Sequence, residues 1–195
     1  FYNNGGIYNI NKNLIEGLNF KNENIRMLDQ SRIGPILNGN KSALKNGVAV
    51  KALFIQNTNP LVVAPETVLV RKGFQRKDLF VCVHEQFLTE TAKYADIVLP
   101  ATSFVEHNDI YIAGGHQHLT FGPKIIKELG ECWSNNRLIN ELSKKMGSVK
   151  KEFSFSEEEF IDNTLKLSNL GNLKELKIKK FIDLQPEFNT SHFIN

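Results

Sequence analysis

Three apolar runs within residues 50–109 constrain the fold of this chain more than any other part of its sequence. They end at Gln56, His84 and Leu99, and each is followed at once by polar or turn-forming residues. The first run is apolar almost throughout, as expected for a strand covered on both faces of a parallel sheet. Helix-like segments separate the runs, which predicts right-handed crossovers between parallel strands. The predicted fold class is therefore α/β: an open parallel sheet of the Rossmann-like βαβαβ type, with flanking helices and a helical C-terminal extension.

Local signals place these elements along the chain. The strands are predicted at Val50–Gln56, Leu79–His84 and Asp96–Leu99. Proline is tolerated in the first turn of a helix, and threonine is a good N-cap. Helices are therefore predicted from Pro65 to about Gly73 and from the cap Thr89 through Tyr94.

The N-terminal part of the chain carries weaker signals. Residues 1–12 are rich in Asn and Gly, and they predict a loop, as do the polar residues 38–48. A short strand is predicted at Ile25–Leu28, followed by a weak helix, Arg32–Leu37, which Gly34-Pro35 interrupts. The chain begins with Phe rather than Met, and an Asn-Asn-Gly-Gly signal follows almost at once, which indicates a piece of a longer protein.

The C-terminal part is predicted to be mainly helical after a long excursion with β-like patches around Tyr111 and Leu119. Ser134 caps an amphipathic helix that runs to Met146. A capping box at Ser156 opens a helix to about Leu167. A lysine-rich amphipathic helix is predicted at roughly Leu173–Phe181.

Composition excludes several classes of protein. The net charge of +3 on 195 residues is too small to indicate a nucleic-acid partner, and the lysines are spread along the chain. No apolar run approaches the roughly 18 residues that would span a bilayer, so no membrane partner is expected. Cys82 and Cys132 cannot form a disulfide framework or a CxxC metal motif, and Cys82 lies in an apolar run that predicts burial.

Polar residues at the strand ends are the candidate binding groups. Glu85 directly follows the second strand, where an acidic side chain can accept hydrogen bonds from a ribose diol; the alternative is a solvated loop carboxylate. Asn57, Thr58 and Asn59 follow the first strand and offer amide and hydroxyl groups to a phosphate or sugar. Asn and Thr also favour turns, so a simple turn cluster remains the alternative.

The sequence lacks the motifs of common catalytic sites. GxGxxG, GxxxxGK[ST] and GxSxG are all missing, so an ordinary NAD-binding unit, a phosphate loop and a nucleophile elbow are not expected. His116-Gln117-His118, with Glu106 and His107 nearby, could suggest a metal site, but so short a spacing is common by chance. We predict neither a catalytic residue nor a metal ligand within this chain.

Four blocks of the sequence, taken together, resemble the molybdopterin oxidoreductases of the dimethyl-sulfoxide-reductase type. The blocks are Ala52–Pro60 (ALFIQNTNP), Asp78–Pro100 (DLFVCVHEQFLTETAKYADIVLP), Ala101–Asp109 (ATSFVEHND) and Gly130–Leu142 (GECWSNNRLINEL). The second block is the most specific, and the resemblance covers most of the chain. It implies a molybdenum bis(molybdopterin guanine dinucleotide) cofactor, of which this fragment would hold one guanine dinucleotide.

The resemblance also implies which residues lie at the cofactor: Asn57, Thr58, Asn59, His84, Glu85, Ala101, His107 and Asn135. Glu85 would bond the guanosine ribose, and His107 would lie where some members place a basic group near the cofactor. Ala101 departs from a pattern that often has Ser or Thr at a phosphate- or guanosine-contacting turn. Asn135 replaces an Asp that reads the guanine edge in many members, and an amide offers one acceptor where a carboxylate offers two.

Further implications concern the whole protein. Residues 1–49 would be a loop-rich lead-in, residues 50–148 the cofactor-binding α/β domain, and residues 149–195 a helical extension. The expected partners are the remaining domains of the same polypeptide, a small-molecule substrate and an electron-transfer subunit. Many members carry a 4Fe-4S cluster on an N-terminal segment. We expect the whole protein to be an oxidoreductase; the alternative is a non-catalytic scaffold subunit without molybdenum. We expect a cytoplasmic location; the alternative is the periplasm.

Overall fold

The computed structural model describes residues 24–112 and 118–184, which form two compact units. The first, which we call the parallel unit, comprises Asn22–Ala101 and Gly130–Trp133. The second, the antiparallel unit, contains Thr102–Leu129 and Ser134–Asn195. The loop predicted at residues 1–12 lies outside the described residues. The segment predicted to bind the cofactor, residues 50–148, contributes to both units.

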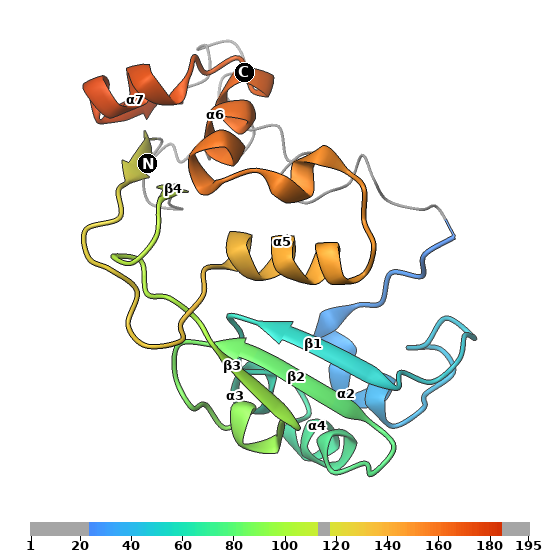
Figure 1. The fold of residues 1–195 in the computed structure, drawn as a ribbon. Helices are drawn as coiled ribbons and strands as arrows, with labels where there is room; N and C mark the ends of the chain where they lie inside the picture. The colour runs from blue at the N-terminus through green and yellow to red at the C-terminus, as the bar shows by residue number, and fades with distance from the viewer. Residues whose placement is uncertain (1–23, 113–117, 185–195) are drawn as a thin grey trace, which may run out of the picture. The chain divides into compact units, whose positions relative to one another are not determined.

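The parallel unit is built on a three-stranded sheet (Figure 1). Its strands are β1 (Ala52–Gln56), β2 (Phe80–Glu85) and β3 (Ile97–Pro100), in the order β1-β2-β3 with every pair parallel. The three strands were predicted, each within two residues of its observed start, and the α/β fold class is confirmed. Their carboxyl ends therefore lie along one edge of the sheet.

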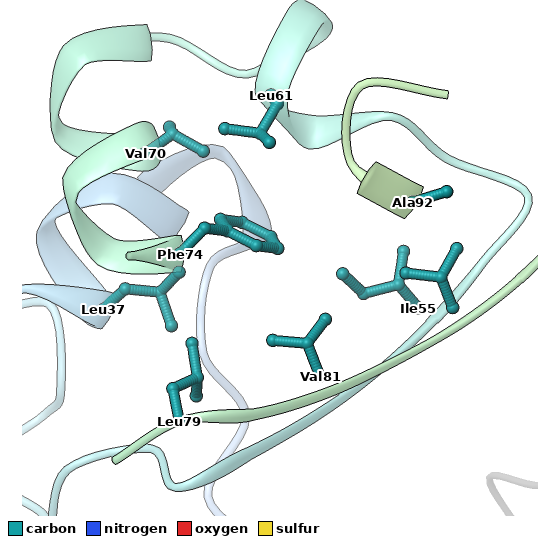
Figure 2. Packing of buried hydrophobic residues seen from close by; sticks show 9 residues of the cluster. Leu37, Ile55, Leu61, Val70, Phe74, Leu79, Val81 and Ala92 are labelled. Atoms are coloured by element: carbon teal, nitrogen blue, oxygen red, sulfur yellow. The ribbon is translucent and has the colours of Figure 1, made fainter. Parts of the chain in front are cut away.

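One face of this sheet packs against helices. These helices are α2 (Ile33–Leu37), α3 (Pro60–Val63), α4 (Thr67–Phe74) and the 3-10 turn η4 (Ala92–Tyr94). Ile55 of β1 and Val81 of β2 point into the core that sheet and helices share, as Figure 2 shows. The buried residues of this core are Leu37, Ile55, Leu61, Val70, Phe74, Leu79, Val81, Val83 and Ala92. Alternate residues of a strand face the same side because a strand has a two-residue period.

Close helix packing explains one glycine. A Cβ placed on Gly73 of α4 would lie 2.4 Å from the Cβ of Leu37 in α2. An alanine would ordinarily favour a helix interior by about 1 kcal/mol over glycine. Here the steric overlap opposes that preference, so α2 and α4 can pack this closely only because residue 73 has no side chain.

The helical connection after β1 differs from the single helix predicted from Pro65. Pro60 is the first residue of α3, where its missing N–H costs no hydrogen bond. The chain then breaks, and α4 begins only at Thr67. Glu66 precedes it with a left-handed φ of 56°, so it lies outside the helix rather than in its first turn. The prediction missed this break because Ala64-Pro65 reads equally well as a helix start.

The N-terminal segment also differs from prediction. Residues 25–28 form no strand; Ile25 and Met27 are exposed, and Leu28 packs on a small cluster formed by Ile36, Ala43 and Leu44. A 3-10 turn, η3 (Gln30–Arg32), is capped by Asp29, whose carboxylate accepts from Ser31 N at 2.9 Å. Proline at position 35 does not interrupt α2, because it falls in the first turn of that helix.

The antiparallel unit contains a second three-stranded sheet, in the order β4-β5-β6. Its strands are β4 (Asp109–Tyr111), β5 (His118–Gly122) and β6 (Phe181–Asp183), and both pairs are antiparallel. The predicted patches around Tyr111 and Leu119 are β4 and β5. The sheet packs on α6 (Glu157–Leu167) and α7 (Leu173–Lys179) through these buried residues: Leu119, Ile161, Leu165, Leu173, Leu176 and Leu184.

Several helix ends in this unit match their sequence signals. Ser134 caps α5 (Asn135–Lys145) and accepts from Arg137 N at 3.3 Å. Ser156 and Glu159 form the predicted capping box of α6, after the 3-10 turn η5 (Lys151–Ser154). The last helix ends earlier than predicted, because Lys180 takes a φ of 72° and Phe181 begins β6. In the described part of the chain, no helix has both the length and the apolar character to cross a membrane.

Candidate cofactor-binding edge

Two backbone hydrogen bonds gather the strand ends of the parallel unit. Asn57 N donates to His84 O at 3.3 Å, and Ala101 N donates to Glu85 O at 3.1 Å. The residues that follow β1, end β2 and follow β3 are therefore neighbours. Six of the eight predicted residues belong to this edge: Asn57, Thr58, Asn59, His84, Glu85 and Ala101. His107 and Asn135 belong to the antiparallel unit.

Asn57, Thr58 and Glu85 offer their polar groups at the surface of this edge. Asn57 has a φ of 51°, a left-handed conformation that Asn adopts more readily than most residues. It turns the chain sharply after β1, and both it and Thr58 are exposed. The carboxylate of Glu85 is partly exposed and accepts from Gln86 N at 2.8 Å. Carboxylate, hydroxyl and amide groups are thus available together.

Asn59 has a structural role. Its Oδ1 accepts from Thr91 Oγ1 at 2.7 Å and from Thr91 N at 3.2 Å. The same Thr91 hydroxyl accepts from Leu61 N at 3.1 Å, and Thr91 is fully buried. These bonds join the connection after β1 to the connection after β2. Sequence reasoning missed Thr91, although it lies in the quoted block Asp78–Pro100.

His84 is buried within the fold. Its side chain is 0% exposed; Nε2 lies 3.0 Å from Trp133 O and Nδ1 lies 3.3 Å from Gln56 Nε2. A carbonyl can only accept, so Nε2 carries the proton in this pairing. His84 therefore supports the edge from beneath by joining β1, β2 and the segment at Trp133.

Ala101 lies where a distant segment rejoins the sheet. It is buried and forms a parallel bridge with Trp133, whose N donates to Pro100 O at 3.0 Å. The short stretch Gly130–Trp133 thus rejoins the parallel unit through a single bridge just after β3. A larger side chain at Ala101 would have to displace this packing, which explains a small residue here.

His107 is held between two oxygen groups in the antiparallel unit. Its Nδ1 lies 2.8 Å from Thr102 Oγ1, and its Nε2 lies 3.9 Å from Asp109 Oδ2. Burial raises the pKa of Asp109, while the nearby His107 lowers it by a smaller amount. The ring orientation is therefore fixed by its own unit. Asn135 is the exposed first residue of α5.

The histidine cluster considered as a metal site is only partly visible. His116 and Gln117 lie outside the described residues. His118 packs edge-on against Phe181, with ring centroids 5.0 Å apart. Within residues 24–112 and 118–184, no three His, Cys, Asp or Glu side chains are grouped to hold a metal ion.

Comparison with known proteins places these features in a family. The family described as "Molybdopterin oxidoreductase" matches residues 3–145. The chain belongs to the molybdopterin oxidoreductase family. Among curated relatives, it is 37% identical over 174 residues to "Probable oxidoreductase YoaE" of Bacillus subtilis (strain 168), covering 89% of this chain and 25% of that protein.

Other molybdopterin oxidoreductase relatives carry more specific names. The chain is 31% identical over 131 residues to the "Assimilatory nitrate reductase catalytic subunit" of Bacillus subtilis (strain 168), covering 65% of this chain and 17% of that one. Among solved structures, "Acetylene Hydratase from Pelobacter acetylenicus" aligns with a TM-score of 0.65 at 21% identity, over 80% of this chain and 21% of that chain. The chain spans a quarter or less of the length of these relatives.

In this molybdopterin oxidoreductase chain, Glu106 has a structural role that the sequence did not predict. It is 6% exposed, and its carboxylate accepts from Ser103 N and from Leu129 N, both at 2.7 Å. It thereby joins the two ends of the excursion, which is the segment from Ser103 to Leu129. Asn108 acts similarly, since its Oδ1 accepts from Lys124 N at 3.0 Å. The signal was a carboxylate inside the quoted block Ala101–Asp109.

We expect Glu106→Gln to change how the antiparallel unit responds to acid. The hydrogen bonds from Ser103 and Leu129 lower the pKa of Glu106 in the folded state. A carboxylate whose pKa is lower in the folded state stabilises the fold fully at pH values above its unfolded-state pKa of about 4.3. This stabilisation is lost as the pH falls through the folded-state pKa. The variant should be less stable at pH 7 and should lose less stability than wild type below about pH 4.

Hydrogen exchange of residues 103–112 between pH 3 and pH 7, corrected for intrinsic rates, measures this difference. Glu131→Gln is the control, because Glu131 is exposed. Equal acid sensitivity of wild type and Glu106→Gln would show that the Glu106 carboxylate does not close the excursion.

Proposed function

We propose that this chain is part of a molybdenum-dependent oxidoreductase and holds one guanine dinucleotide of a molybdenum bis(molybdopterin guanine dinucleotide) cofactor. The observation that carries the proposal is the partly exposed Glu85 carboxylate at the carboxyl edge of the parallel sheet, beside Asn57 and Ala101. Open α/β sheets bind nucleotides at this edge. When bound, the cofactor supplies two-electron redox chemistry, while this chain binds and orients it.

The donor and acceptor groups at the edge suit a nucleotide. A ribose diol donates hydrogen bonds, and the Glu85 carboxylate is a strong acceptor. Asn57 and Thr58 can donate to phosphate or sugar oxygens from the adjoining turn. Asn59 and His84 would act indirectly, because their side chains bond to Thr91, Gln56 and Trp133 within the fold.

Two further residues of the proposed site, Asn135 and His107, belong to the antiparallel unit. Asn135 stands at the capped N-terminus of α5 and would offer its amide to the guanine edge. His107 would present the ring that Thr102 orients. The cytoplasmic location, a 4Fe-4S cluster, an electron-transfer subunit and a small-molecule substrate are parts of the same proposal for the whole protein.

The test is Glu85→Ala in the full-length protein, with GMP released by acid hydrolysis and molybdenum measured per polypeptide. A hydrogen bond to a charged group contributes about 1.5–3 kcal/mol. Loss of the carboxylate should therefore weaken cofactor retention roughly 10- to 100-fold, seen as faster loss of GMP on dilution.

Glu90→Ala is the matched control, since Glu90 lies on the same connection and pairs with Lys93 at the surface. If Glu85→Ala kept GMP as long as Glu90→Ala, the carboxylate would not bind the nucleotide. A wild-type protein with neither molybdenum nor GMP would instead support the non-catalytic scaffold subunit.

A further inference from the structure

The buried ring of His84 is hydrogen-bonded in a way that requires it to be neutral. It is 0% exposed; its Nε2 lies 3.0 Å from Trp133 O, and its Nδ1 lies 3.3 Å from Gln56 Nε2. A carbonyl oxygen needs a proton on Nε2, whereas an amide nitrogen, which can only donate, needs a lone pair on Nδ1. The ring in the closed structure is therefore the uncharged tautomer with its proton on Nε2.

Protonation of the His84 ring would act against both its bonding and its burial. A doubly protonated imidazole donates from both nitrogens, so it would meet the Gln56 N–H groups with a second donor. A charge removed from water is also costly unless an opposite charge is paired with it. The titratable groups of the strands and the segment around the ring are Cys82 and Glu85 on β2, with Glu131 and Cys132 in the stretch Gly130–Trp133.

These surrounding groups do not favour a charged ring. Thiols are uncharged at neutral pH unless their pKa is lowered, and burial raises the pKa of the Cys82 thiol. The Glu85 side chain leaves β2 on the opposite face from His84, because neighbouring strand residues alternate. Glu131 is exposed, so water and salt screen its carboxylate. The closed structure therefore accommodates His84 best without a charge.

The His84 ring fastens the segment Gly130–Trp133 to the proposed nucleotide edge. Trp133 N donates to Pro100 O at 3.0 Å, which holds the segment to β3, while Trp133 O binds the ring and holds the segment to β2. The backbone oxygen of His84 also accepts from Asn57 N at 3.3 Å. Separation of the ring from Trp133 O would therefore loosen the segment at the edge that carries Glu85 and Asn57.

We propose that the hydrogen bond between His84 Nε2 and Trp133 O, which we call the latch, controls release of the bound nucleotide and opens more readily in acid. This inference rests on the proposed function, since it concerns the same ligand. An opened latch exposes the ring, and an exposed imidazole takes up a proton below about pH 6.5. The closed latch excludes that proton, so a fall in pH below this value favours only the opened form, by roughly tenfold per pH unit. His84 is thus a positioning residue.

Nucleotide loss from the full-length protein at about pH 7.5 and about pH 5.5, either side of the ordinary histidine pKa, tests the latch. The protein is diluted at constant ionic strength, and the GMP that stays bound is released by acid hydrolysis and measured over time. Loss of GMP should be about tenfold faster at the lower pH. This range stays above the ordinary carboxyl pKa of about 4.3, so carboxyl titration does not account for the change.

His84→Gln removes the titration and keeps both kinds of hydrogen bond. A glutamine amide can donate to Trp133 O and accept from Gln56, so this variant should hold GMP at neutral pH yet lose most of the acid acceleration. His118→Gln, on β5 of the antiparallel unit, is the matched control and should keep the change of about tenfold. Equal acceleration in His84→Gln and wild type, or none in wild type, would overturn the latch.

Hydrogen exchange of the unmodified full-length protein tests the latch without any substitution. After correction for intrinsic rates, protection of the Trp133 and Asn57 amides should fall about tenfold over the same pH range. Protection that does not change would overturn the latch, whatever the nucleotide result. A wild-type protein that holds no GMP but shows this fall would refute the proposed function while still supporting acid-sensitive opening of the latch.

Discussion

Phe74→Ala should lower the free energy of opening of the parallel unit by about 3–5 kcal/mol. Phe74 is 5% exposed and lies in the middle of the cluster that joins the helices to the sheet (Figure 2). The change removes the transfer free energy of the ring and leaves a cavity among side chains from α2, α4 and β2. Partial collapse of the site would place the loss at the lower end of the range.

Native-state hydrogen exchange of the β2 amides measures this loss without requiring two-state unfolding of a large protein. Phe87→Ala is the matched control, because Phe87 is 73% exposed and should change the free energy of opening by less than about 0.5 kcal/mol. A loss below about 1 kcal/mol for Phe74→Ala would show that this cluster is not the core of the unit.

Thr91→Val should lower the same free energy by about 2–4 kcal/mol, since unsatisfied buried polar groups cost about 1–3 kcal/mol each. Valine keeps the shape of threonine but removes the hydroxyl. Leu61 N then loses its acceptor, and Asn59 Oδ1 loses its shortest donor. The loop after β1 and the loop after β2 should become more dynamic together, because this hydroxyl joins them.

Thr67→Val is the control for Thr91, since Thr67 is exposed at the start of α4. Exchange of the amides of residues 57–63 and 86–92 reports on both loops. If Thr91→Val matched the control, or loosened only one loop, the bonds between Asn59 and Thr91 would not couple the two connections.

The main sheet could be predicted from the sequence because its information is local. Each strand of the parallel unit is a short apolar run that ends at polar or turn-forming residues, and the positions of Gln56 and Glu85 at strand ends follow directly. The capping box at Ser156 is similarly contained within four residues. That Glu85 stands at the carboxyl edge beside Asn57 was therefore predictable, whereas its ligand stays a proposal.

Other features depend on partners that are distant in sequence. His84 ends a predicted strand next to a loop, and the local sequence gives no sign that its ring bonds to the distant Trp133 carbonyl. Asn59 looks like one of three equivalent turn residues, and only the pairing with Thr91 distinguishes it. Phe181 continues a helical pattern, but pairing with β5 places it in a strand. Tertiary contacts decide all three, so local propensity could not.

The return of Gly130–Trp133 to the parallel unit has a consequence for synthesis and dissection of the protein. All three strands of that unit precede Ala101, yet the acceptor for the buried His84 ring is the carbonyl of Trp133, 49 positions after His84. A nascent chain can form the sheet early but cannot complete its carboxyl edge until Trp133 leaves the ribosome. A shortened chain that ends at Ala101 would keep every strand and still leave that buried nitrogen without this acceptor. Any shortened version of the unit that keeps this hydrogen bond therefore extends through Trp133.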